Sequence, residues 1–401
     1  MSLLQTIHCI SNSSYTTKYR NMNTSTNFDD ALEDIKRRAF LLYWNELTSE
    51  YLLPNTIVLA MYLLIGLAGN IAVILVYQFG LDKKTDGRYF IVPLAWIDTT
   101  ALIVTAAFNL TRNMKPVIFP GHGACKLLIY LSYVTTCTSL FLLNAIAVQR
   151  YLKICKPFGS QMNMLWKRFS VLICTIASVL LYIPVLFYYG VVETINHSLG
   201  NISGHQCNKL PGTPGQLRGL KIFQGFGFFV TITNVVTITV LYICITISIV
   251  KQLKRMKFVK VRRDNVIVTT SDATGQTYVP KIQVNLQSAT SDTEISMETS
   301  TRMNEIKEHT TKSATKKSTF RISFMFMTIS IVAFLAYLPS WTFIVIETNN
   351  PAFWKSLPPT AFHICLTLRR MYMINHFCNP FIYGAFDYSF REKIKKMFCK
   401  K

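Results

Sequence analysis

The sequence has little charge: Asp, Glu, Lys and Arg make up only 15% of its 401 residues, whereas half of the residues are hydrophobic. A soluble enzyme of this length would carry more charge, and the long apolar blocks are typical of a helical membrane protein. The sequence also lacks a CxxC pair or a Cys/His cluster, which argues against a zinc site. It contains no nucleophile and base pair, metal triad or phosphate loop, so we expect no enzymatic activity.

Acidic residues are scarce too, with 20 Asp and Glu against 42 Lys and Arg, which gives a net charge of +22. Such an excess can indicate nucleic-acid binding. Here many basic residues lie in loops next to the apolar blocks, where they act as orientation signals for membrane helices. We therefore expect no nucleic acid among the partners.

The N-terminal segment, residues 1–53, is polar and lacks the basic start and apolar h-region of a signal peptide. We expect an uncleaved extracellular tail, with the first membrane helix acting as the signal anchor. Four Asn-x-Ser/Thr sequons fall on the same predicted side of the membrane and are candidate glycosylation sites. They begin at Asn12, Asn23, Asn196 and Asn201.

Seven apolar blocks are long enough to span a bilayer. They occur at about 55–79, 89–111, 123–154, 169–190, 221–250, 320–347 and 361–385. The loops after the first, third and fifth blocks are rich in Lys and Arg, which predicts that these loops and the C-terminus are cytoplasmic and the N-terminus is outside. The sequence therefore predicts an all-α, multi-pass plasma-membrane protein with a seven-transmembrane helix bundle over 54–385. Within it, the Ser/Thr-rich and charged segment 256–319 is expected to be a flexible cytoplasmic loop.

The third block ends in a charged residue. About 24 residues separate Cys125 from Gln149, so a helix of about 36 Å places the cysteine at one mouth of the membrane and Arg150 at the other. An arginine at the edge of a membrane bundle is a candidate functional residue. The alternative is a snorkelling side chain that only marks the inner boundary.

Residues 386–401 follow the last block and predict an interfacial amphipathic helix on the inner leaflet, with a short cytoplasmic tail. The apolar face of this helix comprises Phe390, Ile394, Met397 and Phe398, and cations lie on the opposite face. Cys399 comes next as a candidate palmitoylation site, with a plain thiol as the alternative.

Every predicted membrane helix contains a residue or short motif of one family. These are Gly69-Asn70, Leu94-Ala95 with Asp98, Cys125 with Arg150-Tyr151, Pro184, Tyr242, Pro339, and Asn379-Pro380 with Tyr383. In this order, from about residue 55 to 398, the chain resembles the rhodopsin-like G-protein-coupled receptors. The resemblance implies a receptor in the membrane lipid that binds an extracellular ligand and activates heterotrimeric G proteins, with arrestin and receptor kinases as further partners.

The resemblance also assigns roles to individual residues. Cys125 and Cys207 would form the disulfide that holds the second extracellular loop over the pocket. The prolines in the fourth, sixth and seventh helices would bend them, and Pro339 and Pro380 would act as pivots. The G-protein switch would consist of Arg150, Tyr151, Tyr242 and Tyr383.

Asp98 is a carboxylate near the expected bilayer midplane, so it needs polar partners, a cation or a proton. In the family a matching cluster holds a sodium ion that favours the inactive state, so the only candidate cofactor is an allosteric sodium ion. The candidate ligands are Asp98, Ser139 and Asn375, with Asn70 and Asn379 at comparable depth. A buried hydrogen-bond network without an ion is the alternative.

The sequence departs from the family pattern at several positions. Gln149 replaces the acid before Arg150, the position near Thr319 also lacks an acid, Cys174 replaces a tryptophan, Asn234 replaces a proline, and Tyr337 replaces a tryptophan. Two alternatives therefore stay open: a binding-only receptor without G-protein coupling, and a seven-helix ion or proton carrier that uses Asp98 and Arg150 as relay charges.

The expected ligand pocket is cationic and aromatic. Ser132 stands where amine receptors of the family carry an aspartate, so a monoamine would lack its counter-ion. Arg369 and Arg370 lie about ten residues, or roughly 15 Å of helix, to the extracellular side of Asn379, and Arg369 is the one expected to face inward. The predicted lining is Ser132, Tyr133, Thr136, Tyr337, Trp341, Ile344, Arg369 and Arg370. It suits a peptide such as a neuropeptide, or an acidic small molecule; alternatively, both arginines snorkel outward.

Overall fold

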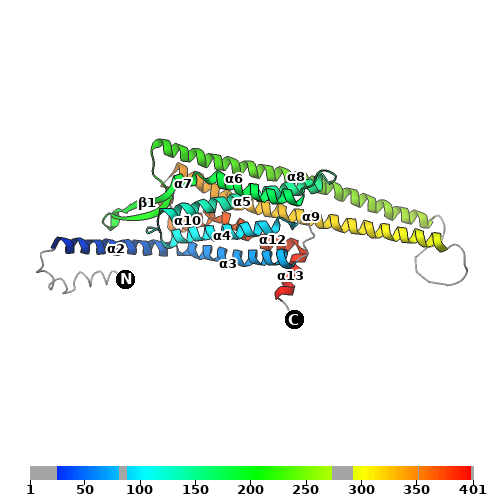
Figure 1. Ribbon diagram of the computed structural model, residues 1–401, viewed down its shortest axis with the longest axis horizontal. Coiled ribbons are helices and arrows are strands. Elements are labelled where there is room, and N and C mark those ends of the chain that lie inside the picture. Colours follow the sequence, from blue (N-terminus) through cyan, green and yellow to red (C-terminus); the bar gives the residue numbers. More distant parts are fainter. Residues whose placement is uncertain (1–24, 81–87, 273–291, 351, 399–401) are drawn as a thin grey trace.

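The apolar blocks of the sequence form long helices that run side by side along the molecule (Figure 1). The structure is a computed structural model that describes the backbone of residues 25–80, 88–272, 292–350 and 352–398. Side chains are described over the same segments except at 25–29, 256–318 and 398.

The elements follow one another in chain order. The helices are α2 (Ser25–Tyr51), α3 (Leu53–Leu75) with a π-turn (Val76–Gly80), α4 (Ile91–Met114), α5 (His122–Cys155), α6 (Met164–Tyr182), α7 (Val185–Tyr188), α8 (Pro214–Asp272), α9 (Asp292–Asn349), α10 (Pro359–Arg369), α11 (Ile374–Phe377), α12 (Asn379–Phe386) and α13 (Tyr388–Phe398). Two strands, β1 (Tyr189–Asn196) and β2 (Ile202–Lys209), separate α7 from α8. Single 3₁₀ turns lie at His197–Leu199, Phe353–Lys355 and Met371–Met373.

Six helices in the described part of the chain are long and apolar enough to cross a membrane. The seventh crossing is divided into α10, the 3₁₀ turn Met371–Met373, α11 and α12, so none of its pieces has the length of a span. Pro380 lies in the first turn of α12. Backbone N–H groups in the first turn have no partner within the helix, so a proline there costs no helical hydrogen bond. The arrangement agrees with the predicted seven-helix bundle.

Helix α5 lies at the centre of the bundle and packs against α4, α6, α8 and α9. Its side chains Leu142, Leu143 and Ile146 are almost completely buried in the largest apolar cluster. Lipid tails are as apolar as these side chains, so the helices gain stability from close packing rather than from transfer out of water.

Small residues on α3 permit this close packing. A Cβ atom at Gly69 would lie 2.8 Å from Cγ of Pro380, and one at Gly66 would overlap Leu102. A side chain at either position would therefore push α3 away from α4 or from the seventh crossing.

The strands form an antiparallel hairpin at one end of the bundle, called here the hairpin end. A disulfide between Cys125 at the start of α5 and Cys207 of β2 ties the hairpin to the bundle, which confirms the predicted pairing. Residues Gly200 and Asn201 turn the chain at the tip, both with positive φ.

Helix α2 projects from the same end (Figure 1). The amide of Asn45 donates to Met114 O at 3.1 Å, and Val117 N donates to Asn45 Oδ1 at 3.4 Å. The ring of Trp44 lies so close to Gly204 of β2 that an added Cβ there would be 2.9 Å away. Part of the predicted polar tail is therefore a helix that rests on the hairpin.

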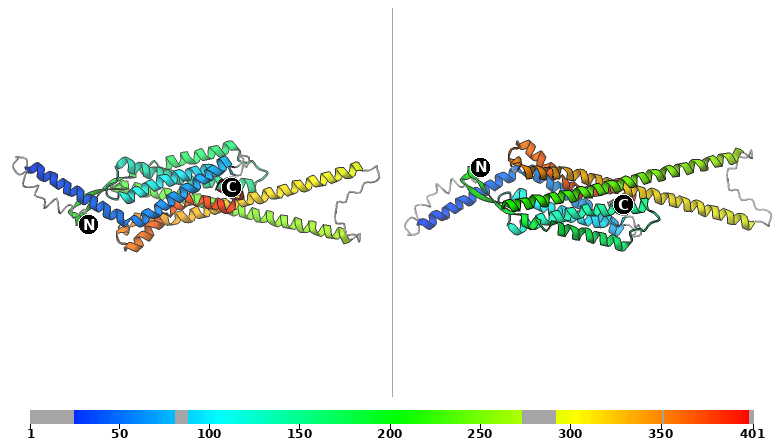
Figure 2. Two further views of the ribbon diagram at one scale, coloured as in Figure 1. Left: turned by 90° about the horizontal axis from the view of Figure 1, so that it is seen from below. Right: turned by 90° about the horizontal axis from the view of Figure 1, so that it is seen from above.

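Helices α8 and α9 extend well past the bundle at the opposite end, called here the α13 end (Figure 2). Their extensions enter the segment 256–319, which the sequence predicted to be a flexible loop. Neither extension contains proline or glycine, so nothing in their backbones interrupts the helices that come from the bundle.

Asp387 anchors α13 to the bundle and is 1% exposed. One carboxylate oxygen accepts hydrogen bonds from Ser389 N and Arg88 Nη2, both at 3.0 Å, and the other accepts from Tyr77 OH at 2.8 Å. Phe390 stacks on Tyr77 with ring centroids 5.5 Å apart. Asp387 thus caps α13 and neutralises Arg88.

Candidate functional site

Aromatic side chains line the bundle towards the hairpin end. Tyr133 of α5 stacks on Tyr182 of α6 at 5.1 Å between ring centroids. Tyr337 of α9 stacks at 6.4 Å on Tyr372 of the seventh crossing, and Trp341 contacts the ring of Phe228 edge-on. Three of the predicted pocket residues therefore come from helices that face each other.

Arg369 forms a two-point ion pair with Glu347 of α9. Its Nε lies 2.6 Å from Oε1 and its Nη2 lies 3.0 Å from Oε2. Trp354 Nε1 also donates to Glu347 Oε1, at 2.7 Å. Sequence reasoning missed Glu347, although an acid inside an apolar block is itself a signal of a buried partner.

Arg370 points away from Arg369 and is 4% exposed. It donates to the side-chain oxygens of Asn55 in α3 and Asn113 in α4. Asn113 in turn donates to Thr56 Oγ1 at 3.0 Å. Arg370 therefore holds α3, α4 and the seventh crossing together through neutral amides, which solvate its buried charge.

Arg112, in the last turn of α4, is a second residue that sequence reasoning missed. Its guanidinium carbon lies 5.5 Å from the ring centroid of Phe108, and it lies within electrostatic range of Arg369 and Glu347. It forms no hydrogen bond or ion pair with any residue that the structure describes. The signal in the sequence that could have indicated Arg112 is a basic residue at the end of a predicted membrane helix.

Lys209 of β2 adds a further cation beside the Arg369 and Glu347 pair. Burial lowers the pKa of Lys209, Glu347 opposes this shift, and Arg369 adds to it. We call Arg112, Lys209, Arg369 and Arg370 the cationic cluster. Glu347 is the one carboxylate within its electrostatic range among the described residues.

The remaining predicted pocket residues have different surroundings. The Ser132 hydroxyl donates to Leu128 O at 2.7 Å, so it is engaged within its own helix. Thr136 Oγ1 lies 3.5 Å from Nε2 of His376. Ile344 is half-buried on α9, one turn from Glu347.

Asp98 lies at the centre of a buried polar network. Its Oδ1 accepts from Ser139 Oγ at 2.8 Å, and its Oδ2 accepts from Asn379 Nδ2 at 2.6 Å. Asn375 Nδ2 donates to Ser139 Oγ at 3.2 Å. Nδ1 of His376 lies 2.9 Å from Asp98 Oδ1. The structure thus brings the predicted residues together and adds a histidine that the sequence alone did not indicate.

Asn70 joins this network through the backbone of its neighbours. Its Nδ2 donates to Gly66 O at 3.0 Å and to His376 O at 2.7 Å. A single amide therefore links α3 to the short helix α11.

Arg150 is buried towards the α13 end and is 1% exposed. Its Nη2 donates to Gln149 Oε1 at 3.2 Å, and its guanidinium lies 5.0 Å from the ring centroid of Phe326. Tyr242 and Tyr383 are buried in the same apolar cluster as Phe326. The amide of Gln149 thus takes the place of the acid usual at this position, and the predicted switch residues lie around one cluster, with Tyr151 packed against it.

One further departure from the family pattern, Asn234, also has structural partners. Asn234 Oδ1 accepts from Asn144 Nδ2 at 2.9 Å, and Asn234 Nδ2 donates to Leu140 O at 3.3 Å, so this residue ties α8 to α5. Pro184 separates α6 from α7, whereas Pro339 lies inside the continuous helix α9.

The family described as 7 transmembrane receptor (rhodopsin family) matches residues 69–383, which is most of the chain. The chain belongs to this family. As a member of a family of non-enzymatic receptors, the receptor is a multi-pass membrane protein. Squid rhodopsin has the same fold, with a TM-score of 0.59 at 18% identity over 88% of this chain and 86% of that one.

Receptors for peptides are among the similar proteins. The receptor is 28% identical to the thyrotropin-releasing hormone receptor of Gallus gallus over 114 residues, 28% of this chain and 29% of that one. It is 27% identical to the motilin receptor of Homo sapiens over 146 residues, 35% of each chain. It is 24% identical to the tachykinin-like peptides receptor 99D of Drosophila melanogaster over 180 residues, 43% of this chain and 34% of that one. The matched segments span about a third of each relative's length.

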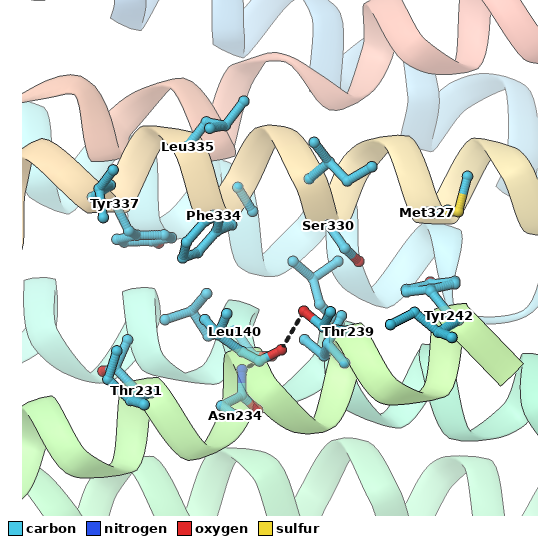
Figure 3. Close-up of a pocket in the computed structure, with 18 of the residues that line it drawn as sticks. Leu140, Thr231, Asn234, Thr239, Tyr242, Met327, Ser330, Phe334, Leu335 and Tyr337 are labelled. Carbon is cyan, nitrogen blue, oxygen red and sulfur yellow. Dashed lines mark hydrogen bonds between the residues drawn. The ribbon is translucent and has the colours of Figure 1, made fainter.

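A groove with a volume of about 410 Å³ runs between α8 and α9 and reaches Leu140 and Leu143 of α5 (Figure 3). It extends from Tyr337 and Trp341 to Tyr242 and Met327, and its rim includes exposed apolar residues such as Leu335. The groove shows that α8 and α9 pack loosely between the predicted pocket and the predicted switch.

The predicted modification sites are only partly described. Asn196 and Asn201 flank the tip of the hairpin, where Asn201 is exposed. Asn12, Asn23 and Cys399 lie outside the described residues. Glycosylation and palmitoylation of the receptor stay predictions.

Proposed function

We propose that this receptor lies in the plasma membrane with the hairpin end outside, binds a peptide that carries an acidic group, and then activates a heterotrimeric G protein. The observation that carries the proposal is the cationic cluster, in which four cations stand against one carboxylate. An excess of partly buried positive charge favours a ligand that brings negative charge to it.

Within the cluster, Arg112 is the best candidate for the ligand carboxylate. Arg369 already has a two-point partner in Glu347, and Arg370 donates to two amides. Arg112 has a planar donor fork that can bind a carboxylate at two points, and its ring contact with Phe108 orients it.

A peptide is favoured over a small acid for two reasons. Tyr133, Tyr337 and Trp341 offer aromatic surface next to the charge, which suits side chains of a peptide. The names of three similar proteins also identify them as receptors for thyrotropin-releasing hormone, for motilin and for tachykinin-like peptides.

Signal transfer would use the hinge in α9. Pro339 lies between Tyr337 and Trp341 and has no N–H to donate to Leu335 O, so the helix can bend there and widen the loosely packed boundary with α8. Bending would move Phe326 away from Arg150 and open the α13 end to a G protein. Arrestin and receptor kinases are further proposed partners at this end.

The test is nucleotide exchange on purified G proteins by the full-length receptor in lipid nanodiscs. Peptides are supplied in matched pairs that differ only in one group, Glu against Gln or a C-terminal carboxylate against an amide. We expect an active peptide whose neutral partner is at least about tenfold less potent, a loss of about 1.4 kcal/mol.

Three outcomes would contradict the proposal. Equal potency of both members of every active pair would remove the acidic group from it. Peptide binding without nucleotide exchange would identify a binding-only receptor. Charge movement across proteoliposomes without nucleotide exchange would identify a carrier.

A further inference from the structure

His376 occupies one side of the carboxylate at which the family's sodium ion is expected. Its Nδ1 lies 2.9 Å from Asp98 Oδ1, and both side chains are completely buried. A carboxylate can only accept hydrogen bonds, so this ring nitrogen carries a proton when Asp98 is ionised. The ring then supplies a hydrogen-bond donor to the carboxylate.

The Asp98 carboxylate accepts hydrogen bonds from two further side chains. Ser139 Oγ donates to Oδ1, and Asn379 Nδ2 donates to Oδ2. A sodium ion needs several oxygen ligands pointing at it, but the groups that face Asp98 here present hydrogen atoms. The residues as arranged do not fit the ion.

The second nitrogen of the histidine is also engaged. Its Nε2 lies 3.5 Å from Thr136 Oγ1 on α5, and its backbone oxygen accepts from Asn70 on α3. His376 thus contacts three helices of the bundle core from α11. The contacts with Thr136 and Asn70 hold the imidazole ring in place beside Asp98.

We propose that the His376 imidazole replaces the allosteric sodium ion in this receptor. The hydrogen bond between His376 and Asp98 then joins α11 to α4 and stabilises the closed bundle. The receptor is therefore insensitive to sodium. Thr136 belongs to the predicted ligand pocket, and Asn375, next to His376, donates to Tyr337 OH at 3.4 Å. Ligand contacts therefore reach the Asp98 network through side chains and need no exchange of an ion with solvent.

The same geometry predicts how sodium binding could be created. Asn70 Oδ1 and Asn375 Oδ1 are buried oxygens without a hydrogen-bond partner among the described residues. Replacing the ring by a small hydroxyl group, as in His376→Ser, would free Asp98 Oδ1 from the ring nitrogen and open space in this network, and free carboxylate and amide oxygens suit a hard cation.

The experiment is thermal unfolding of the purified full-length receptor in sodium chloride and in choline chloride at equal ionic strength. For the unmodified receptor we expect the same midpoint in both salts. For His376→Ser we expect a saturable rise with sodium, by at least about 2 °C at ten times the dissociation constant. The double variant Asp98→Asn/His376→Ser should lose this rise, and His376→Asn provides a second way to open the site.

Two results would overturn the proposal. One is a saturable sodium response of the unmodified receptor that Asp98→Asn abolishes, since the ring would then yield to the ion. The other is folded His376→Ser and His376→Asn variants without any sodium response, since the imidazole would then not be what excludes sodium. The measurement needs no ligand, so its outcome is independent of the proposed peptide.

Discussion

Arg369 and Glu347 neutralise each other across the boundary between α9 and the seventh crossing, with both donor–acceptor distances at or below 3.0 Å. Their side chains are 25% and 16% exposed, so the pair is shielded from water only in part. It links the helix that contains the Pro339 hinge to the helix that continues into the Asp98 network.

Arg369 and Glu347 should stabilise the receptor through their interaction with each other. We expect Arg369→Ala and Glu347→Ala each to lower the thermal midpoint, because each leaves a half-buried charge without its partner. The charge swap Arg369→Glu/Glu347→Arg should recover part of the loss. A double-mutant cycle should give a coupling energy of about 1–2 kcal/mol, between the values for exposed and buried pairs. Additive losses would show that the two charges act independently.

Arg112 should determine the response to the acidic group. We expect Arg112→Gln to raise the half-maximal concentration of an acidic peptide at least about tenfold, because a charge-assisted hydrogen bond contributes about 1.5–3 kcal/mol. Arg112→Lys should recover only part of this, since it keeps the charge but loses the two-point geometry. The neutral partner peptide is the control, and its potency should not change. An equal loss for both peptides would assign Arg112 a structural role.

The disulfide should be essential for a receptor that reaches the cell surface. Cys125→Ser and Cys207→Ser should each reduce surface expression or ligand binding, because the bond closes a loop of 82 residues and such bonds contribute about 2–5 kcal/mol. The matched control is Cys244→Ser, which alters a free and half-buried cysteine of α8. Normal surface expression and binding in both disulfide variants would show that the bond is dispensable.

Asp387 should control the docking of α13. Asp387→Asn removes the charge that Arg88 pairs with, and we expect faster amide hydrogen exchange throughout Tyr388–Phe398. Glu392→Gln is the control, because its ion pair with Lys396 is exposed and should not affect docking. Unchanged exchange in the Asp387 variant would mean that Phe390 and Tyr77 suffice to hold the helix.

Gln149 should influence basal signalling. Its amide accepts a hydrogen bond from the charged Arg150, and Gln149→Asp would turn this contact into an ion pair. We expect lower ligand-independent nucleotide exchange, because the closed state gains stability over the open one. Arg150→Ala should remove G-protein activation while leaving the receptor at the surface. Basal exchange that does not change in Gln149→Asp would separate this contact from the switch.

The sequence predicted the features that depend on runs of residues. Seven apolar blocks, basic loops and a marker in each helix were sufficient for the bundle and its family, and Cys125 and Cys207 were paired through the resemblance. These signals survive divergence because the bilayer sets the length of every span.

The sequence did not predict which faces of the helices pack against each other when those helices lie far apart in the chain. The partners of Arg369 and Arg370, and the position of His376 against Asp98, depend on the rotation of each helix within the bundle. The 3₁₀ turn Met371–Met373 changes that rotation within the seventh crossing, so a regular helix drawn on the sequence could not place them. Helix α2 was missed because its polar composition resembles that of a tail without structure.

Helix α2 stands out from the hairpin end as a single long element. Its 27 residues form a rod of about 40 Å that is fixed near its base by Asn45 and Trp44. An affinity tag, a glycan or an antibody epitope placed before Ser25 is therefore tethered at the far tip and not at the rim of the bundle. The receptor could be immobilised through this tip for binding measurements, so that the surface that holds it lies away from the rim of the bundle.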